Sequence, residues 1–268
     1  MSTYPKSLMQ AIDSFGLTGE PIPLAGGQNL SVKVGEAVLK PVDDLSHYEW
    51  LLSILDEVQP TGYRLSKPLR TASGAFVGHG WMASLFEPGR ECDGRIKDKL
   101  ETARMFHKDL APFRTEDMEA ANHRWARAHR VAWQESELPH PLPDQVHSIL
   151  AGLLRHLEPK NYPRQLVHGD LSGNILFHET LSPLVIDFSP TVAPVEYAEA
   201  ILVCDCIAWQ RSPLEEINLL PKSEFYKEML LRAIVFRLSV EVFCDSLNTQ
   251  SFRKQYMLFK PILDYLGY

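Results

Sequence analysis

The sequence predicts a mixed α+β protein in two parts, because strand patterns fill its first third and helical patterns fill most of the rest. Between Pro21 and Val42, short apolar runs alternate with polar residues and with turn residues such as Gly35-Glu36. Beyond Gly89, apolar residues recur mostly at the three- and four-residue spacing of amphipathic helices. We therefore expect a small antiparallel-sheet domain over residues 1–88 and a larger, mainly helical domain over residues 89–268.

The first part carries patterns for five strands and two helices. In chain order we expect a helix over 5–15, strands over 22–24, 30–34 and 37–39, a helix over 47–58, and strands over 65–71 and 75–86. Leu51, Leu52 and Leu55 give the second helix one apolar face, and the Asp and Ser residues at 43–46 offer it a cap. Ser73-Gly74 is a turn between the last two strands.

The second part carries helical patterns with one interruption. The expected helices cover 96–110, 118–133, 144–157, 196–210, 222–245 and 251–266. The interruption lies at 165–187, where two short apolar runs flank a polar loop. We expect this region to form a strand, a loop and a second strand.

Composition excludes two classes of partner. The net charge of −7 argues against nucleic acid, because phosphate-backbone binding depends on clustered Lys and Arg. The apolar run at 200–209 is interrupted by Asp205 and is too short to cross a membrane. The N-terminal residues show no basic segment followed by an apolar one, so we expect a cytoplasmic protein. The oligomeric state cannot be read from the sequence.

The interruption holds the residues that point to chemistry. Asp170 follows His168-Gly169, Asn174 comes four residues later, and the second apolar run ends at Asp187. A carboxylate within hydrogen-bond reach orients a substrate hydroxyl and takes its proton as the hydroxyl attacks a phosphate. Amide and carboxylate oxygens suit Mg²⁺, which neutralises phosphates. The pattern predicts an ATP-dependent small-molecule kinase, with Asp170 as base and Asn174 and Asp187 as magnesium ligands.

A simpler interpretation of these residues is open. Asp170 and Asn174 could only cap a turn, and Asp187 could only end a strand. Each feature is common alone. Their occurrence together, in this order and after a strand-rich region, favours the catalytic interpretation.

With these residues, the sequence resembles the aminoglycoside phosphotransferase family, which shares the protein-kinase-like fold with choline and fructosamine kinases. The resemblance spans roughly residues 20–245 and is most specific over 166–190. It implies a bilobal fold with a small antiparallel-sheet N-lobe and a larger, mainly helical C-lobe. It gives Asp170 the role of base and Asn174 and Asp187 that of magnesium ligands, while His168 shapes the loop.

The resemblance also implies a nucleotide site in the first part. Val38-Leu39-Lys40-Pro41 resembles the strand whose lysine contacts the nucleotide phosphates, and Glu49 on the next helix is the candidate partner of Lys40. Both side chains also fit an ordinary surface role. The implied cofactors are ATP, or another nucleoside triphosphate, and Mg²⁺.

Two further nucleotide contacts follow from position in the family's fold. Gly26 and Gly27 lie where the hairpin that covers the phosphates belongs, although a plain turn explains them equally well. The backbone groups of Leu85 and Glu87 lie where the hinge beside adenine belongs.

The sequence departs from the family pattern in the catalytic loop. Relatives place the Asn five residues after the Asp, whereas Asn174 follows Asp170 by four, which shortens the reach by about 3.5 Å. Gly173 offers a compensation, since glycine can adopt a positive φ. After Asp187, Phe188-Ser189-Pro190 replaces the glycine usual in protein kinases, and the stretch before the next helix is too short for a peptide platform.

The acceptor and the activity are the open questions. Residues 195–268, where the acceptor site should lie, hold ten Asp or Glu residues and eight Lys or Arg residues, which gives no support for a polycationic antibiotic. A small hydroxylated metabolite is the default acceptor. The alternative to an enzyme is a catalytically silent nucleotide-binding module with a regulatory role, and the shortened loop is the feature that favours it.

Overall fold

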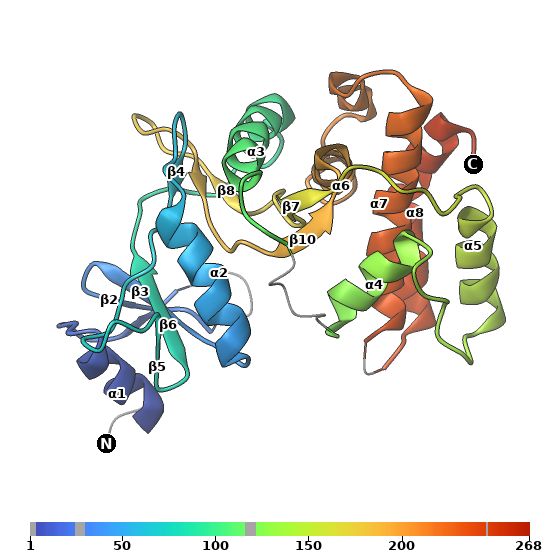
Figure 1. The fold of residues 1–268 in the computed structure, drawn as a ribbon. Helices are drawn as coiled ribbons and strands as arrows, with labels where there is room; N and C mark the ends of the chain where they lie inside the picture. Colours follow the sequence, from blue (N-terminus) through green and yellow to red (C-terminus); the bar gives the residue numbers. More distant parts are fainter. Residues whose placement is uncertain (1–3, 25–29, 116–121, 245) are drawn as a thin grey trace. The chain divides into compact units, whose positions relative to one another are not determined.

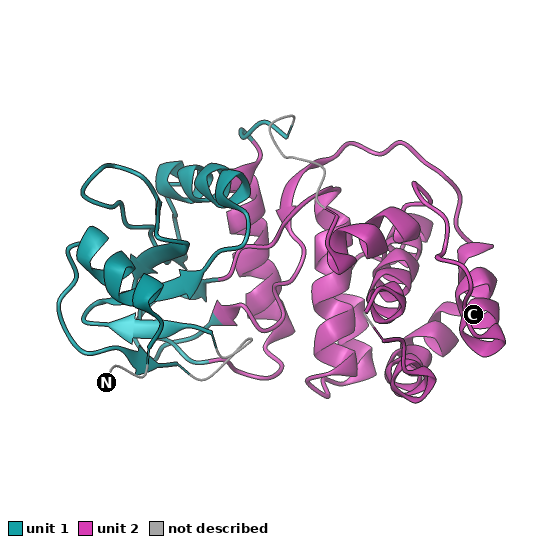
Figure 2. Ribbon diagram, turned by 90° about the horizontal axis from the view of Figure 1, so that it is seen from below, with its two compact units in different colours: residues 1–90, 112–119, 176–186 teal, residues 91–111, 120–175, 187–268 magenta. Residues whose placement is uncertain are grey.

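The computed structural model describes residues 4–24, 30–115, 122–244 and 246–268. The chain divides into two compact units, shown in Figure 2. Unit 1 comprises residues 1–90, 112–119 and 176–186, and unit 2 comprises residues 91–111, 120–175 and 187–268. The predicted division after residue 88 concerns functional lobes and stays a prediction. The mixed α+β class with a small antiparallel sheet is confirmed.

Unit 1 is built on a five-stranded antiparallel sheet of order β1-β2-β3-β6-β5 (Figure 1). Its elements are α1 (Lys6–Ser14), β1 (Ile22–Pro23), β2 (Val32–Val34), β3 (Ala37–Pro41), α2 (Leu45–Glu57), β5 (Val77–Gly78) and β6 (Trp81–Leu85). Leu8 and Ile12 of α1 pack on Val34 and Leu39, which makes this face of the sheet a buried core. Alternate residues such as Lys40 point to the opposite face.

Two expected strands of unit 1 differ from the structure. The run expected as one strand over 75–86 is a hairpin of β5 and β6, because His79 (φ 53°) and Gly80 (φ 79°) form a left-handed turn between them. The run expected over 65–71 is only β4 (Arg64–Leu65). The residues after β4 stay beside β6, with an isolated bridge between Pro68 and Ser84, whereas β4 itself pairs in parallel with β9 (Leu184–Val185), more than a hundred residues away.

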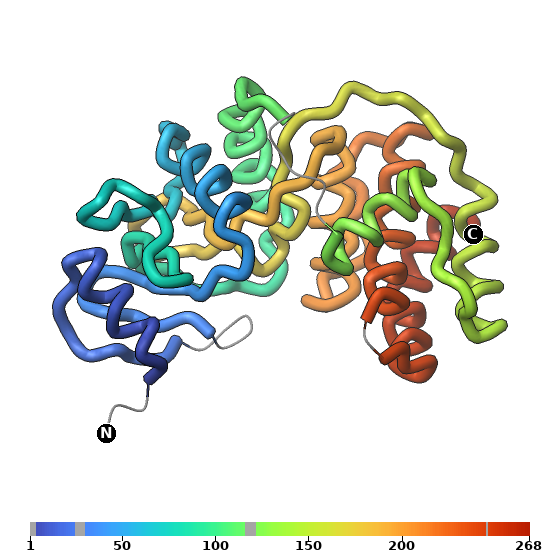
Figure 3. The backbone as a smooth tube through the Cα atoms, turned by 60° about the horizontal axis from the view of Figure 1, so that its bottom comes forward, coloured from blue at the N-terminus to red at the C-terminus, as the bar shows by residue number. Residues whose placement is uncertain are grey.

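Unit 2 consists mainly of helices around a two-stranded ribbon. Its helices are α3 (Ile96–Leu110), α4 (Arg124–Ala132), α5 (Asp144–Leu154), α6 (Val195–Ala208), α7 (Glu224–Val242) and α8 (Thr249–Leu266), with a 3₁₀ turn at Leu214–Leu219. The ribbon pairs β7 (Gln165–His168) with β10 (Pro190–Ala193). Figures 1 and 3 show α4 lying along α7, against which it packs.

The helices of unit 2 bury nearly continuous apolar surface. Almost every residue of α6 is buried, as is most of α7, so the two helices form the centre of this unit. Among the residues that the structure describes, no helix is both long and apolar enough to span a membrane.

Candidate active site

The β7–β10 ribbon holds the segment of Asp170 beside the segment of Asp187. His168 lies opposite Pro190 in the antiparallel register, and the Gly169 amide donates to the Ser189 carbonyl at 3.0 Å. A Cβ at Gly169 would lie 3.0 Å from Thr191 Oγ1, so a larger residue here would displace the threonine side chain of the neighbouring strand by a few tenths of an ångström. The ribbon therefore brings together two of the three predicted site segments.

The hairpin of β8 (Ile175–Leu176) and β9 adjoins the third predicted site segment, which contains Asn174. Asn174 immediately precedes β8, and Asp187 comes two residues after β9, its neighbour in the sheet. Because only residues 177–183 connect these strands, Asn174 and Asp187 flank the same end of the hairpin. Both positions lie within unit 2.

The side chain of Asn174 is oriented by the loop itself. Its Nδ2 donates to the Asp170 carbonyl at 2.6 Å and lies 3.4 Å from Asp170 Oδ2. Oδ1 of the same amide makes no hydrogen bond to another described residue. An amide oxygen and the Asp187 carboxylate form the donor set that Mg²⁺ uses when phosphates complete its coordination, so the residues present fit that ion.

The shortened loop closes without help from Gly173. Gly173 does not have a positive φ, so the compensation considered from the sequence is wrong. The loop closes instead through a hydrogen bond from the backbone amide of Asn174 to the Leu171 carbonyl at 3.2 Å. The left-handed residue of the site is Asp187, with φ 51°, a conformation that Asp tolerates better than most residues.

Two buried histidines support the loop that carries Asp170. The Asp170 amide donates to His168 Nδ1 at 3.1 Å, and the His168 amide donates to His107 Nε2 at 3.1 Å. Phe106 and Phe188 pack edge-on against His168 and against each other. His168 thus has the loop-shaping position implied by the resemblance. Because His107 Nε2 accepts, its proton lies on Nδ1, which is buried without a partner.

Burial of His107 makes the stability of the fold depend on pH. It lowers the pKa of His107 to about 3, and the neighbouring His168 acts in the same sense. The unfolded chain binds this proton near pH 6.5, so stability is fully present above that pH and is lost as the pH falls below it. We expect His107 to contribute about 1.4 kcal/mol to the stability lost between pH 7.5 and pH 5.5.

Urea unfolding at the two pH values tests this expectation. His107→Gln, which retains an acceptor for the His168 amide, should show a correspondingly smaller loss. His147→Gln, at an exposed position of α5, should behave like the parent. An equal loss in all three proteins would contradict the assignment.

Arg237 is the site residue that the sequence analysis missed. It lies on α7, is only 7% exposed, and donates through Nη2 to Asp170 Oδ1 at 2.7 Å. The same guanidinium bonds to both oxygens of Asp205, through Nε at 2.9 Å and through Nη2. Burial lowers the pKa of Arg237, but the two carboxylates outweigh it and raise the value above normal, so Arg237 stays charged.

Asp205, which interrupts the apolar run at 200–209, is fully buried on α6 and is bonded to side chains. Its partners are Arg237 and the Ser172 hydroxyl, at 3.4 Å. A signal for this pairing was present. Arg237 interrupts a buried apolar stretch of α7, and a charged residue there requires a buried partner.

A second buried cation holds the loop from α3. Lys99 is fully buried, and its Nζ donates to the Ser172 carbonyl at 2.8 Å and to Gln210 Oε1 at 2.7 Å. Gln210 Nε2 donates to the same carbonyl at 3.0 Å. Two donors therefore fix the peptide between Ser172 and Gly173. The sequence signal was a lysine on the apolar face of the helix shared with Ile96, Leu100 and Ala103.

The predicted nucleotide residues lie in unit 1 and are described apart from this loop. Lys40 stands on β3 opposite Met82. Glu49 accepts the amides of Phe76 and Val77 at 2.9 to 3.2 Å, which ties α2 to the β5 segment. A pairing of Glu49 with Lys40 stays a prediction. Gly26 and Gly27 lie outside the described residues.

Leu85 and Glu87, the residues predicted for the hinge, differ in the hydrogen bonds that their backbone groups form. The Leu85 amide donates to the Lys67 carbonyl at 2.8 Å, and its own carbonyl accepts from Ser66 Oγ at 2.7 Å. Glu87 pairs through its side chain with Arg64 at 2.8 Å. No hydrogen bond from the Glu87 backbone is found within the described ranges, and the hinge role of both residues stays a prediction.

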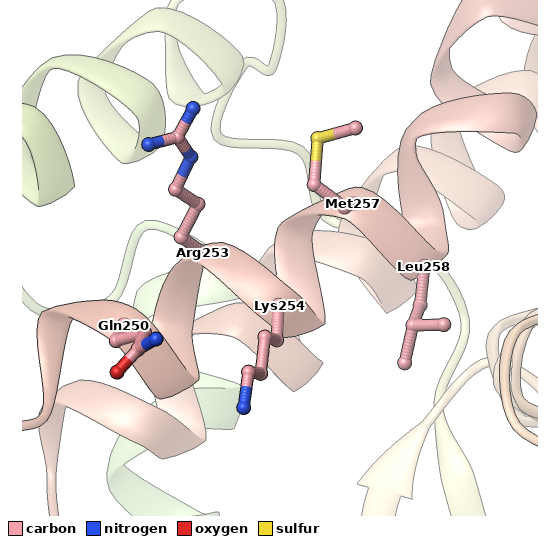
Figure 4. A pocket seen from close by; sticks show the side chains of 5 residues that line it. All are labelled: Gln250, Arg253, Lys254, Met257 and Leu258. Carbon is pink, nitrogen blue, oxygen red and sulfur yellow. The ribbon is translucent and has the colours of Figure 1, made fainter.

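A shallow surface pocket on α8 is separate from these residues. Figure 4 shows its lining, which comes entirely from one helix: Gln250, Arg253, Lys254, Met257 and Leu258. None of the predicted site residues takes part in it. Within the described ranges, no three His, Cys, Asp or Glu side chains gather as a metal cluster.

Comparisons with known proteins agree with the fold. The model of the phosphotransferase enzyme family (APH) matches residues 33–216. No curated protein matches the chain. The AMP-bound spectinomycin phosphotransferase APH(9)-Ia is similar over 97% of this chain and 95% of its own, at 14% identity and a TM-score of 0.61. Choline kinase LicA from Streptococcus pneumoniae is similar over 98% of both chains, at 12% identity and a TM-score of 0.63.

A third solved structure carries both a nucleotide analogue and an acceptor. It is a thermostable mutant of aminoglycoside phosphotransferase APH(4)-Ia in a ternary complex with AMP-PNP and hygromycin B. It is similar over 98% of both chains, at 16% identity and a TM-score of 0.62. At these low identities, the TM-scores and the coverage show a shared fold alone.

The fold and the site define a small-molecule kinase with a protein-kinase-like fold. The chain belongs to the phosphotransferase enzyme family, whose model covers more than half of it. The resemblance, the fold class and the enzyme class predicted from the sequence are thereby confirmed.

Proposed function

We propose that this protein transfers the terminal phosphate of ATP, or of another nucleoside triphosphate, to a hydroxyl group of a small molecule in a magnesium-dependent reaction. The loop geometry carries the proposal. Asn174 is bound to Asp170 through its amide nitrogen, which leaves its oxygen for a metal, and the ribbon keeps Asp187 alongside.

In this reaction Asp170 orients the acceptor hydroxyl and takes its proton as the oxygen attacks the terminal phosphorus. The bond between that phosphorus and the bridging oxygen breaks, and the nucleoside diphosphate leaves. Asn174 and Asp187 would hold Mg²⁺, which neutralises charge on the phosphates when bound. Arg237 and Lys99 keep the loop in place during the transfer.

The nucleotide would be held by unit 1. Lys40 is proposed to contact the phosphates with Glu49 as its partner, Gly26 and Gly27 to cover them, and the hinge backbone to contact the base. AMP and AMP-PNP in the similar structures support a nucleotide ligand.

The proposed setting is the cytoplasm, with a small hydroxylated molecule as the partner rather than nucleic acid. All four cysteines are free, which fits a reducing compartment. The net charge of −7 disfavours nucleic acid.

Two measurements on the purified protein test this function. Calorimetry should show ATP binding that strengthens with Mg²⁺, and a panel of hydroxylated metabolites should contain members that release ADP above the rate of background hydrolysis. Binding of ATP that is indifferent to Mg²⁺, with no ADP release, would instead support the silent nucleotide-binding module.

A further inference from the structure

Arg237 connects the proposed base to the helices where the acceptor is expected. Its Nη2 donates to Oδ1 of Asp170, which makes this oxygen less basic than Oδ2 and orients the carboxylate. Asn174 Nδ2 lies 3.4 Å from Oδ2, at the limit of a hydrogen bond. Oδ2 is therefore the oxygen that we expect to receive the proton of an acceptor hydroxyl.

The guanidinium also has a donor to spare. Nε and Nη2 make all the bonds of Arg237 to Asp170 and Asp205. Its Nη1 makes no hydrogen bond to another described residue. An arginine N–H of this kind, beside the reacting position, can donate to an oxygen of the bound acceptor.

Most carboxylates of α6 and α7 form ion pairs with Lys or Arg residues of the protein itself. Six acidic residues stand on these helices, and Glu196 and Glu241 are the two without an ion pair within the described ranges. The four pairings are Glu199 with Arg104, Asp205 with Arg237, Glu224 with Lys227, and Glu228 with Lys160 and Arg232. A site for polycations needs acids that are free to pair with the ligand.

We propose that Arg237 selects the acceptor, and that the acceptor is an oxygen-rich alcohol without a positive charge near the reacting hydroxyl, such as a polyol or a hydroxy acid. This inference rests on the proposed function. An ammonium group in the position facing Nη1 could not form a hydrogen bond with it, because both groups are donors only. A second hydroxyl or a carboxylate in that position accepts a hydrogen bond from Nη1 instead.

Matched acceptors that differ in one group test the selection. ADP release is measured in the presence of Mg²⁺ and ATP for two pairs of acceptors: glucose and glucosamine, and glycerol and 2-amino-1,3-propanediol. Kanamycin is included as a polycationic acceptor. We expect kcat/KM for the hydroxyl member to exceed that for the amino member at least tenfold. A preference for the amino members or for kanamycin would overturn the proposal.

Variants of Arg237 separate selection from folding. Arg237→Met combined with Asp205→Leu removes both buried charges together, which avoids leaving one of them unpaired. We expect this pair of changes to lower kcat at least 100-fold, to alter the Mg²⁺–ATP dissociation constant less than twofold, and to reduce acceptor discrimination to about threefold or less. Arg237→Lys keeps the positive charge but loses the planar guanidinium, which binds two oxygens at once. This variant should retain the preference for hydroxyl over amino acceptors at a reduced kcat.

Arg232 provides the matched control, because it is a fully buried arginine of the same helix that pairs with Glu228 instead of Asp170. Arg232→Lys should leave acceptor discrimination unchanged. Loss of discrimination in both lysine variants, or its retention in the double variant, would overturn the role of Arg237.

Background ATP hydrolysis, in which water is the acceptor, extends the test when no panel member reacts. The double variant should then hydrolyse ATP at least tenfold more slowly than the parent at equal nucleotide affinity, and unchanged hydrolysis would overturn the proposal. Failure of the proposed function is distinguishable, because it would appear as ATP binding without dependence on Mg²⁺.

Discussion

Replacing Asp170 with asparagine is expected to lower kcat for phosphoryl transfer at least 100-fold while leaving nucleotide affinity within about twofold. Asparagine has nearly the same shape and can still accept a hydrogen bond from Arg237, but it cannot take the proton of the acceptor hydroxyl. A 100-fold loss corresponds to about 2.7 kcal/mol of transition-state stabilisation. ADP release and calorimetric ATP binding measure the two quantities separately.

The fold should tolerate this change. The Asp170 side chain is 46% exposed, and Arg237 keeps its bonds to Asp205 when the first carboxylate is lost. We therefore expect the free energy of unfolding to stay within about 1 kcal/mol of the parent. Asp264→Asn, at an exposed pair with Lys260 on α8, is the control for loss of a surface carboxylate. Turnover equal to the parent in Asp170→Asn would remove Asp170 from the role of base.

The local parts of the fold were predictable because their signals lie within single elements. The helix over 96–110 is found with those bounds, and Asp44 caps α2 by accepting the His47 amide at 3.0 Å. Both features depend on residues a few positions apart, where periodicity and capping chemistry act.

Pairings between distant segments were not predictable in this way. Strand β4 pairs with β9, and β10 pairs with β7, although the sequence offered only short apolar runs with no indication of their partners. Such short strands obtain their stability from a partner that is remote in the chain, so composition alone misjudges their length and place.

The candidate site shows the same limit. Asp170, Asn174 and Asp187 were predicted from their spacing within one strand–loop–strand segment, and their joint role in a site stays a prediction. Arg237 reaches Asp170 from a helix 67 residues later, through a contact that no spacing encodes. Its only trace in the sequence is a charge within an apolar stretch, which predicts a buried partner without saying which one.

Asp187→Asn is expected to abolish the dependence of ATP binding on Mg²⁺ and to lower turnover at least 100-fold. The charged oxygen is the stronger of the two proposed protein ligands, and a neutral amide offsets less of the charge that Mg²⁺ brings to the phosphates. Asparagine is chosen over alanine because residue 187 has φ 51°, which Asn adopts more readily than Ala. Calorimetric titration of ATP with and without Mg²⁺ measures the effect.

Comparison with Asp187→Ala then separates the metal from the backbone. Alanine removes the same carboxylate and in addition strains the left-handed position, so its free energy of unfolding should fall by about 1 kcal/mol relative to the asparagine variant. The two variants should nevertheless lose the Mg²⁺ dependence of ATP binding to the same extent, because that property depends on the carboxylate. ATP affinity that still rises with Mg²⁺ in both variants would place the metal ligand elsewhere and leave Asp187 with only a conformational role in the loop.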